Sequence, residues 1–88
     1  MTPLEDTALI IPCFNEAKRI DLDQFELLAT SSGVSLLFVN DGSTDSTQSL
    51  LLGFKTRFPE TVHVLELERN QGKGEAVRRG LLQAIQLG

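Results

Sequence analysis

The chain has 88 residues, a formal net charge of −4 and a hydrophobic fraction of 41%. This length allows one small domain, and this composition is typical of a folded chain rather than a disordered one. The acidic balance, with no basic stripe interleaved with aromatic residues, argues against nucleic acid as a partner.

The single cysteine, Cys13, excludes an internal disulfide and a cysteine-based zinc site. It lies in an apolar run, so we interpret it as a small buried hydrophobe. The first residues are acidic where a signal peptide would be basic, and no stretch reaches the roughly 20 apolar residues of a membrane span. The chain taken alone is therefore expected to be soluble and cytoplasmic.

Three apolar runs predict the strands of a sheet. Residues 7–11 and 34–39 are nearly continuous apolar runs, typical of strands covered on both faces of a parallel sheet. Residues 62–67 alternate more, so the third strand is expected to be less buried and nearer an edge. His63, the only histidine, is expected to be half-exposed on this strand.

Helical patterns follow each strand. Asp23 and Glu26 have the spacing of a capping box at the start of a first helix, which should end by Gly33. The second helix is expected to begin near residue 43 or 44 and to end before Pro59. Its predicted inner face comprises Thr47, Leu50, Leu51, Phe54 and Phe58.

The third helix has the clearest helical periodicity. Gly80 lies on its inner face and costs about 1 kcal/mol of helix propensity relative to alanine. We therefore expect Gly80 to allow a close approach of this helix to the sheet. The predicted inner face comprises Ala76, Val77, Gly80, Leu81, Ala84 and Ile85.

The βαβαβα pattern predicts an α/β fold with three layers, a parallel sheet and right-handed crossovers. The simplest strand order is one, two, three. The first strand, which reads as fully buried, would then lie at an edge that something should cover or extend.

A polar segment follows each strand: "PCFNEAKR", "NDGSTDS" and "RNQGKGEA". Each could be an ordinary turn. Ligands of open α/β sheets bind beyond the carboxyl ends of the strands, however, and all three segments fall there. Together they predict a binding crevice.

Asp41 is the central residue of this predicted crevice. A carboxylate fixed at a strand tip accepts hydrogen bonds from ring N–H groups or ribose hydroxyls, and Gly42 allows the sharp turn beside it. Glu16 could bind a ribose in the same way. Phe14 is either a stacking surface for a base or a core residue.

Lys73, between two glycines at the mouth of the third helix, places positive charge and free backbone N–H groups where a phosphate would be stabilised. The segment is not a Walker A loop. It also lacks the third glycine of the dinucleotide fingerprint and does not follow the first strand. A generic ATP or NAD site is therefore disfavoured.

Together these segments resemble the family 2 inverting glycosyltransferases. "IIPCFNEAKRI" is similar to their P-x-[YF]-N-E element, and "FVNDGSTDST" is similar to V-[DN]-D-G-S-x-D-x-T. "RNQGKGEAVRRGL" resembles N-x-G-K-G-x-A-x-x-x-G, notably in the polyprenol (dolichyl) phosphate glucosyl- and mannosyltransferase branch. The order of the elements agrees, and the match spans nearly the whole chain.

The resemblance implies that residues 1–88 are the N-terminal, nucleotide-binding part of a GT-A (Rossmann-like) domain. The implied donor is a UDP- or GDP-sugar, and the implied acceptor is a lipid phosphate or a glycan. The implied nucleotide-binding residues are Pro12, Phe14, Asn15, Glu16, Asp41, Gly72 and Lys73.

The resemblance also implies Mg²⁺ or Mn²⁺ in a full-length parent, bound by a D-x-D element after the next strand. No aspartate follows Asp45 in this chain. We therefore expect that the 88 residues bind no metal, contain no catalytic residue and do not transfer sugar alone. The parent could associate with the cytoplasmic face of a membrane.

Two alternatives remain open. The chain could be a nucleotide-binding module without chemistry, or an α/β module that self-associates through the exposed edge of its first strand. A response-receiver module is disfavoured, because the third strand leads to Arg69–Asn70 where a phospho-acceptor aspartate would be expected.

Overall fold

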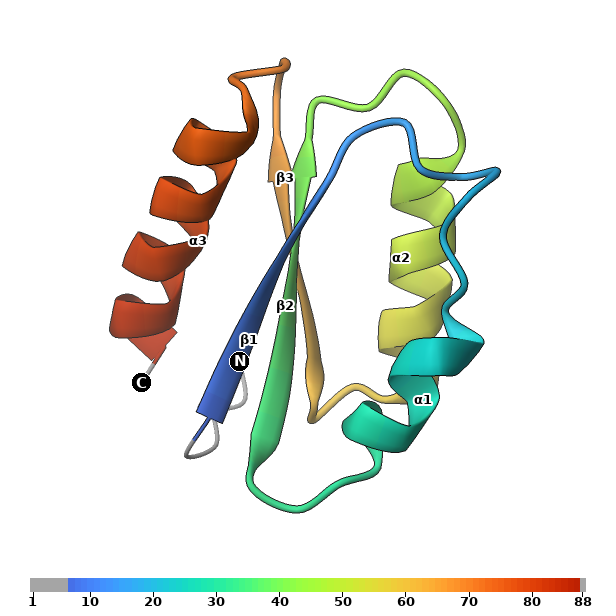
Figure 1. Cartoon of the computed structure of the whole chain (residues 1–88). Coiled ribbons are helices and arrows are strands. Elements are labelled where there is room, and N and C mark those ends of the chain that lie inside the picture. Colours follow the sequence, from blue (N-terminus) through green and yellow to red (C-terminus); the bar gives the residue numbers. More distant parts are fainter. Residues whose placement is uncertain (1–6, 88) are drawn as a thin grey trace.

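The computed structural model describes residues 7–87 and contains a parallel sheet with helices on both faces (Figure 1). The strand order is β1-β2-β3, as expected. The predicted α/β class with βαβαβα order is confirmed. The elements are β1 (Thr7–Cys13), α1 (Asp23–Ala29), β2 (Val34–Asp41), α2 (Thr47–Arg57), β3 (Val62–Leu67) and α3 (Lys73–Leu87).

Helices α1 and α2 cover one face of the sheet, and α3 covers the other (Figure 1). Successive side chains of a strand point to opposite faces, so β2 supplies both cores. Its residues 35–41 are all buried. The central strand therefore carries most of the hydrophobic stabilisation of the sheet.

Aromatic side chains link the sheet to α1 and α2. Phe38 of β2 packs edge-to-face against Phe25 of α1, with ring centroids 5.3 Å apart, and against Phe54 of α2 at 6.0 Å. Phe54 in turn contacts Phe58 at 5.2 Å. Edge-to-face pairs of this kind add to the energy of burial. This cluster anchors both short helices on β2.

Gly80 brings α3 close to the other face of the sheet. A Cβ atom built on Gly80 would lie 2.6 Å from Ile10 Cγ2 and 2.9 Å from Val39 Cγ2. Both distances are shorter than carbon–carbon contacts allow. The expected close approach is confirmed, and Gly80 is buried together with Ala76.

Burial of the outer strands differs from the prediction. β1 lies at an edge, and only Cys13 on it is buried, so the expectation of a fully buried strand is wrong. An apolar run alone does not distinguish an edge strand from a central one. β3 is less buried than β2, as expected, but more buried than β1.

His63 on β3 is buried, with 2% of its surface exposed, so the half-exposed placement is also wrong. Within residues 7–87 neither ring nitrogen has a hydrogen-bond partner. Burial lowers the pKa of His63, and the nearby charge of Lys55 lowers it further. At neutral pH the imidazole is therefore in its neutral form.

The helix starts also differ from the prediction. The capping box is absent: α1 has no side-chain cap, and the Asp23 N–H group donates to Asp21 Oδ1 at 3.1 Å instead. Helix α2 begins at Thr47 rather than at residue 43 or 44, because Asp45 Oδ1 accepts the Thr47 N–H group at 2.9 Å and the preceding residues form a loop.

Three residues predicted on inner helix faces are exposed: Leu50 of α2, and Leu81 and Ile85 of α3. Each helix meets the small sheet along a narrower stripe than its apolar pattern suggests. Among residues 7–87 no helix is both long and apolar enough to cross a membrane.

Candidate functional site

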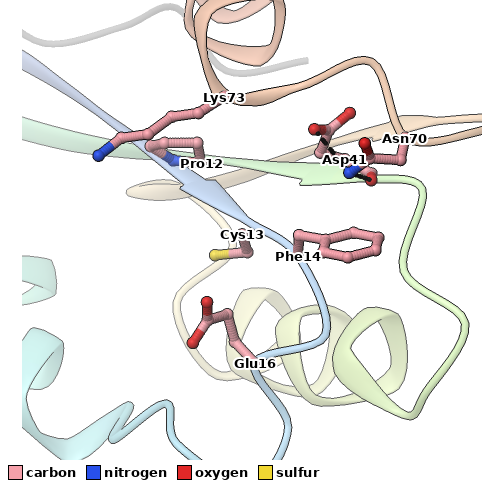
Figure 2. Close-up of a pocket in the computed structure, with 7 residues that line it drawn as sticks. All are labelled: Pro12, Cys13, Phe14, Glu16, Asp41, Asn70 and Lys73. Atoms are coloured by element: carbon pink, nitrogen blue, oxygen red, sulfur yellow. Dashed lines mark hydrogen bonds between the residues drawn. The ribbon is translucent and has the colours of Figure 1, made fainter.

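A hollow of about 310 Å³ lies at the carboxyl ends of the strands (Figure 2). Five of the predicted site residues line it, namely Pro12, Phe14, Glu16, Asp41 and Lys73. Asn15 and Gly72 do not. Two lining residues, Cys13 and Asn70, were not predicted. The polar segments that follow the three strands thus meet at one place.

Asp41 ends β2 and is tied to the loop that precedes α3. Its Oδ1 atom accepts the Gln71 N–H group at 2.7 Å, and its Oδ2 atom accepts the Gly72 N–H group at 3.0 Å. Asn70 Nδ2 donates to Oδ2 at 3.2 Å and to the main-chain oxygen of Asp41 at 3.3 Å. Asp41 is only 3% exposed, yet it borders the hollow.

These contacts limit what Asp41 can accept from a ligand. A carboxylate offers about four lone-pair positions. The loop of residues 70–72 uses three of them. About one position therefore remains for a donor in the hollow, and the carboxylate cannot rotate without breaking the loop contacts.

Gly42 makes the contact between β2 and this loop possible. It has φ +70°, and a Cβ atom there would lie 2.2 Å from both the carbonyl carbon of Arg69 and the nitrogen of Asn70. Glycine is thus required twice, for its left-handed backbone and for its lack of a side chain. The predicted sharp turn is confirmed.

Phe14 follows β1 directly and is 41% exposed. It belongs to neither hydrophobic core cluster of the described residues. In Figure 2 its ring extends toward the pair formed by Asp41 and Asn70. Of the two interpretations left open, a stacking surface fits this placement and a core residue does not.

Lys73 is the first residue of α3 and is exposed. Figure 2 shows its side chain extending past Pro12 and away from Asp41. The first turn of a helix presents unpaired N–H groups and partial positive charge. The hollow therefore has an acidic acceptor on one side and a cationic group on another.

Gly72 shapes the loop without lining the hollow. It has φ +94°, donates its N–H group to Asp41 and accepts the Ala76 N–H group at 2.9 Å. Its described contacts are with the protein itself, and its place in a nucleotide site stays a prediction.

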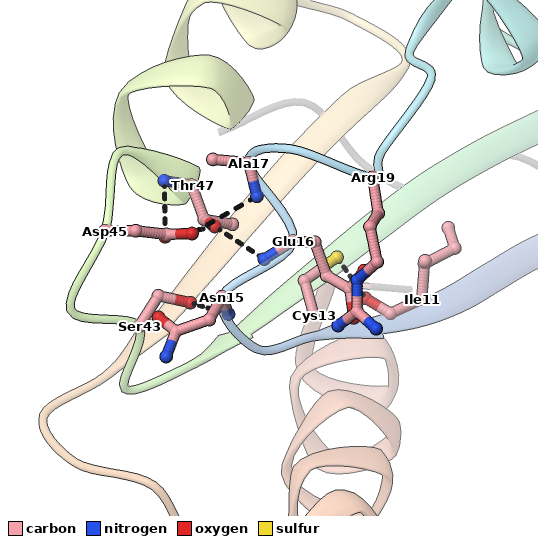
Figure 3. Close-up of polar contacts among 9 residues, drawn as sticks. All are labelled: Ile11, Cys13, Asn15, Glu16, Ala17, Arg19, Ser43, Asp45 and Thr47. Atoms are coloured by element: carbon pink, nitrogen blue, oxygen red, sulfur yellow. Dashed lines mark hydrogen bonds and ion pairs between the residues drawn. The ribbon is translucent and has the colours of Figure 1, made fainter.

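Asn15 joins two loops rather than facing the hollow (Figure 3). It has φ 49°, which is uncommon for a residue other than glycine. Its N–H group donates to Ser43 Oγ at 3.0 Å, and its Oδ1 atom accepts the Thr44 N–H group at 2.8 Å. These bonds fix the backbone immediately after Phe14.

Asp45 and Thr47 extend this connection between the two loops (Figure 3). Thr47 Oγ1 accepts the Glu16 N–H group at 2.9 Å, and Asp45 Oδ2 accepts the Ala17 N–H group at 3.3 Å. The hydrogen bond donated by the Thr47 hydroxyl is the largest cause of a lowered pKa at Asp45. An ionised Asp45 therefore holds both the helix start and residue 17.

Cys13 is buried, as predicted, and also borders the hollow. Burial, followed by the charge of Glu16, raises the pKa of the Cys13 thiol to about 11. The thiol stays protonated at neutral pH and is no nucleophile there. Glu16 itself accepts a hydrogen bond from Arg19 Nη2 at 3.1 Å.

Asn70 is the residue that sequence reasoning missed and that matters most in the geometry. It lies shortly after β3, inside the segment already singled out for Lys73. Its position after a strand was the available signal. Within residues 7–87 no group of three or more histidine, cysteine, aspartate or glutamate side chains could hold a metal ion.

Known proteins share the sequence pattern of this chain. Residues 8–85 match the model of glycosyl transferase family 2. Dolichyl-phosphate beta-glucosyltransferase of Drosophila melanogaster is 40% identical over 94% of this chain, which covers 28% of that protein. The Dictyostelium discoideum protein of the same name is 34% identical over 85% of this chain, which covers 26% of that relative. The chain therefore spans little more than a quarter of these relatives.

Solved structures have the same fold. A Pyrobaculum calidifontis mannosyltransferase in complex with GDP-Man and Mn²⁺ superposes with a TM-score of 0.76, at 22% identity, over 92% of this chain and 25% of that chain. S. aureus TarS 1-349 superposes with a TM-score of 0.72, at 25% identity, over 90% of this chain and 24% of that chain. The expected family is thus confirmed, and this chain belongs to glycosyl transferase family 2.

Proposed function

We propose that residues 1–88 form the nucleotide-binding part of a glycosyltransferase that transfers a sugar from a nucleotide-diphosphate sugar to a lipid phosphate. One observation carries the proposal: groups suited to a base, a ribose and a phosphate converge on one hollow, although they follow three different strands. The topology brings the three strand ends together, and the chemistry of the side chains found there suits a nucleotide.

Each lining group has a role in this proposal. The exposed ring of Phe14 stacks on the base, and the remaining acceptor position of Asp41 takes a donor from the base or ribose. Glu16 accepts from a ribose hydroxyl. Lys73, at the start of α3, attracts the diphosphate. Pro12 forms part of the wall.

The sugar acceptor is inferred from similarity alone. Two matched relatives are named dolichyl-phosphate beta-glucosyltransferases, which supports a lipid-phosphate acceptor for the parent enzyme. The polar hollow supports only the donor half of the reaction. We infer the sugar acceptor from the names of these relatives and the donor from the geometry.

A divalent cation would belong to the parent enzyme and not to these residues. The Pyrobaculum mannosyltransferase was solved with Mn²⁺. The described residues present no cluster of ligands that fits such an ion, and we assign no step to it here. We expect the 88 residues to bind nucleotide without transferring sugar.

Calorimetric titration of the chain with UDP and GDP, with and without Mn²⁺, tests the proposal. Lys73→Ala and Phe14→Leu remove exposed groups, so these variants should fold normally. Asp41→Ala removes the central acceptor. Glu60→Ala is the matched control, because this exposed acidic residue precedes β3, at the opposite end of the sheet.

We expect saturable binding of at least one nucleotide that each site variant weakens and that Glu60→Ala leaves unchanged. Lys73→Ala should reduce the affinity for UDP and GDP more than the affinity for uridine and guanosine, titrated in parallel. Absence of binding by the wild type, or equal binding by all variants, would refute the proposed site.

A further inference from the structure

The geometry points to Asn70 as a positioning residue: it holds the Asp41 carboxylate in the orientation that nucleotide binding requires. This inference rests on the proposed function, in which Asp41 accepts a hydrogen bond from the nucleotide. It adds a residue that sequence reasoning did not select and that acts through another side chain.

The Asn70 side chain contacts Asp41 twice. Its Nδ2 atom donates to Asp41 Oδ2 at 3.2 Å and to the Asp41 main-chain oxygen at 3.3 Å (Figure 2). One amide group thus fixes both the end of strand β2 and the carboxylate. Aspartate or leucine at position 70 could not donate both bonds at neutral pH.

The next two residues of the loop bind the same carboxylate. The Gln71 and Gly72 N–H groups also donate to the carboxylate, at 2.7 Å and 3.0 Å. They reach it because Gly42 lets the loop backbone approach without a clash. Asn70 is the residue of this loop segment, 70–72, that lines the hollow.

Burial makes Asp41 depend on its hydrogen-bond partners. A buried carboxylate is stable only when its oxygens are paired, and hydrogen bonds to a charged group are stronger than neutral ones. With Asn70 in place, Asp41 keeps about one free acceptor position and lines the hollow. Without Asn70 the carboxylate gains freedom to rotate away from a bound ligand.

The experiment combines nucleotide titration with amide hydrogen exchange on the complete chain. Asn70→Ala deletes the donor, and Asn70→Asp replaces it with a carboxylic acid of the same shape. Gln86→Glu is the matched control, because it makes the same amide-to-acid change at an exposed site near the far end of α3.

We expect Asn70→Ala to weaken UDP or GDP binding about tenfold and to lower the exchange protection of the Gln71 and Gly72 amides to a similar extent. In the Asn70→Asp variant, a protonated side chain can donate one of the two hydrogen bonds that asparagine donates. Two ionised carboxylates, in contrast, repel each other. The affinity of this variant, relative to wild type at the same pH, should therefore be closer to normal at about pH 4.5 and about tenfold weaker at about pH 8. Gln86→Glu should show no such dependence.

The outcomes separate this inference from the proposed function. If the wild type binds nucleotide and Asn70→Ala binds it equally well, the inference is wrong. If Asn70→Ala loses binding with unchanged amide protection, Asn70 contacts the nucleotide itself, and the positioning role is wrong. If the wild type binds no nucleotide, the proposed function fails. In that case, weaker amide protection in Asn70→Ala would still support the hold of Asn70 on Asp41. Unchanged amide protection would refute that hold.

Discussion

Substituting alanine for two different glycines tests how closely α3 lies against the sheet. Gly80 and Gly53 both lie inside helices and have ordinary helical backbones, so alanine should improve helix propensity equally at both positions, by up to about 1 kcal/mol. Their surroundings differ. A Cβ atom at Gly53 meets nothing within 4 Å, whereas one at Gly80 would contact the sheet.

The cost at position 80 follows from the distances. The new methyl carbon would lie 2.6 Å from Ile10 Cγ2 and 2.9 Å from Val39 Cγ2. Ordinary carbon–carbon contacts are about 3.5–4.0 Å, and overpacking of this kind costs about 1–3 kcal/mol. Both neighbours are β-branched and therefore stiff. After the propensity gain, Gly80→Ala should destabilise the fold by about 1 kcal/mol, and Gly53→Ala should stabilise it by about 0.5–1 kcal/mol.

Urea unfolding followed by circular dichroism measures both effects as shifts of the midpoint at constant slope. The two variants should move the midpoint in opposite directions. Equal stabilisation by both would show that α3 is not seated on Ile10 and Val39, and would refute the packing derived for this face.

Two further perturbations follow from the structure. Burial lowers the pKa of His63, so the unfolded chain binds its proton more readily, and stability should fall as the pH drops below about 6.5, the ordinary histidine value. Unfolding midpoints between about pH 5 and 8 should show this loss in the wild type and not in His63→Leu; an equal pH dependence in both would contradict the account. Gly42→Ala should cost more than about 2 kcal/mol, because its Cβ would lie 2.2 Å from the backbone of Arg69 and Asn70 at a left-handed φ; a thermal midpoint equal to wild type would disprove that close contact.

Much of the fold can be predicted because strand patterns are local. The apolar pattern gives the third strand its observed bounds and ends the first two strands two residues short at the polar end. Those missing residues, 12–13 and 40–41, pair within the sheet despite their mixed chemistry. Backbone pairing, and not hydrophobic pattern, extends the strands into the site.

The errors share a physical cause: burial depends on what covers an element. His63 reads as half-exposed in its sequence, but it lies buried on β3. Leu81 and Ile85 fit a helical stripe, yet α3 contacts the sheet through Ala76 and Gly80 and leaves both exposed. Sequence periodicity indicates the direction of a face and not its width.

The candidate site, like the fold, can be predicted only in part from the sequence. Residues presented at strand ends, such as Asp41 and Lys73, are predictable because the topology brings those ends together. The roles of Asn15 and Asn70 are not, because they arise from hydrogen bonds to residues about 30 positions away in the sequence. The sequence places both residues shortly after a strand, but it does not indicate which partner each one holds.

A titration of the ¹⁵N-labelled chain with UDP and GDP, followed by ¹H–¹⁵N correlation spectra, tests the central claim most directly. The account predicts saturable shifts confined to the amides around Phe14, Asp41 and Lys73, with the amides at the opposite ends of the strands unchanged. Shifts centred elsewhere, or spectra that do not change at millimolar nucleotide, would contradict a shared nucleotide site at the carboxyl ends of the three strands.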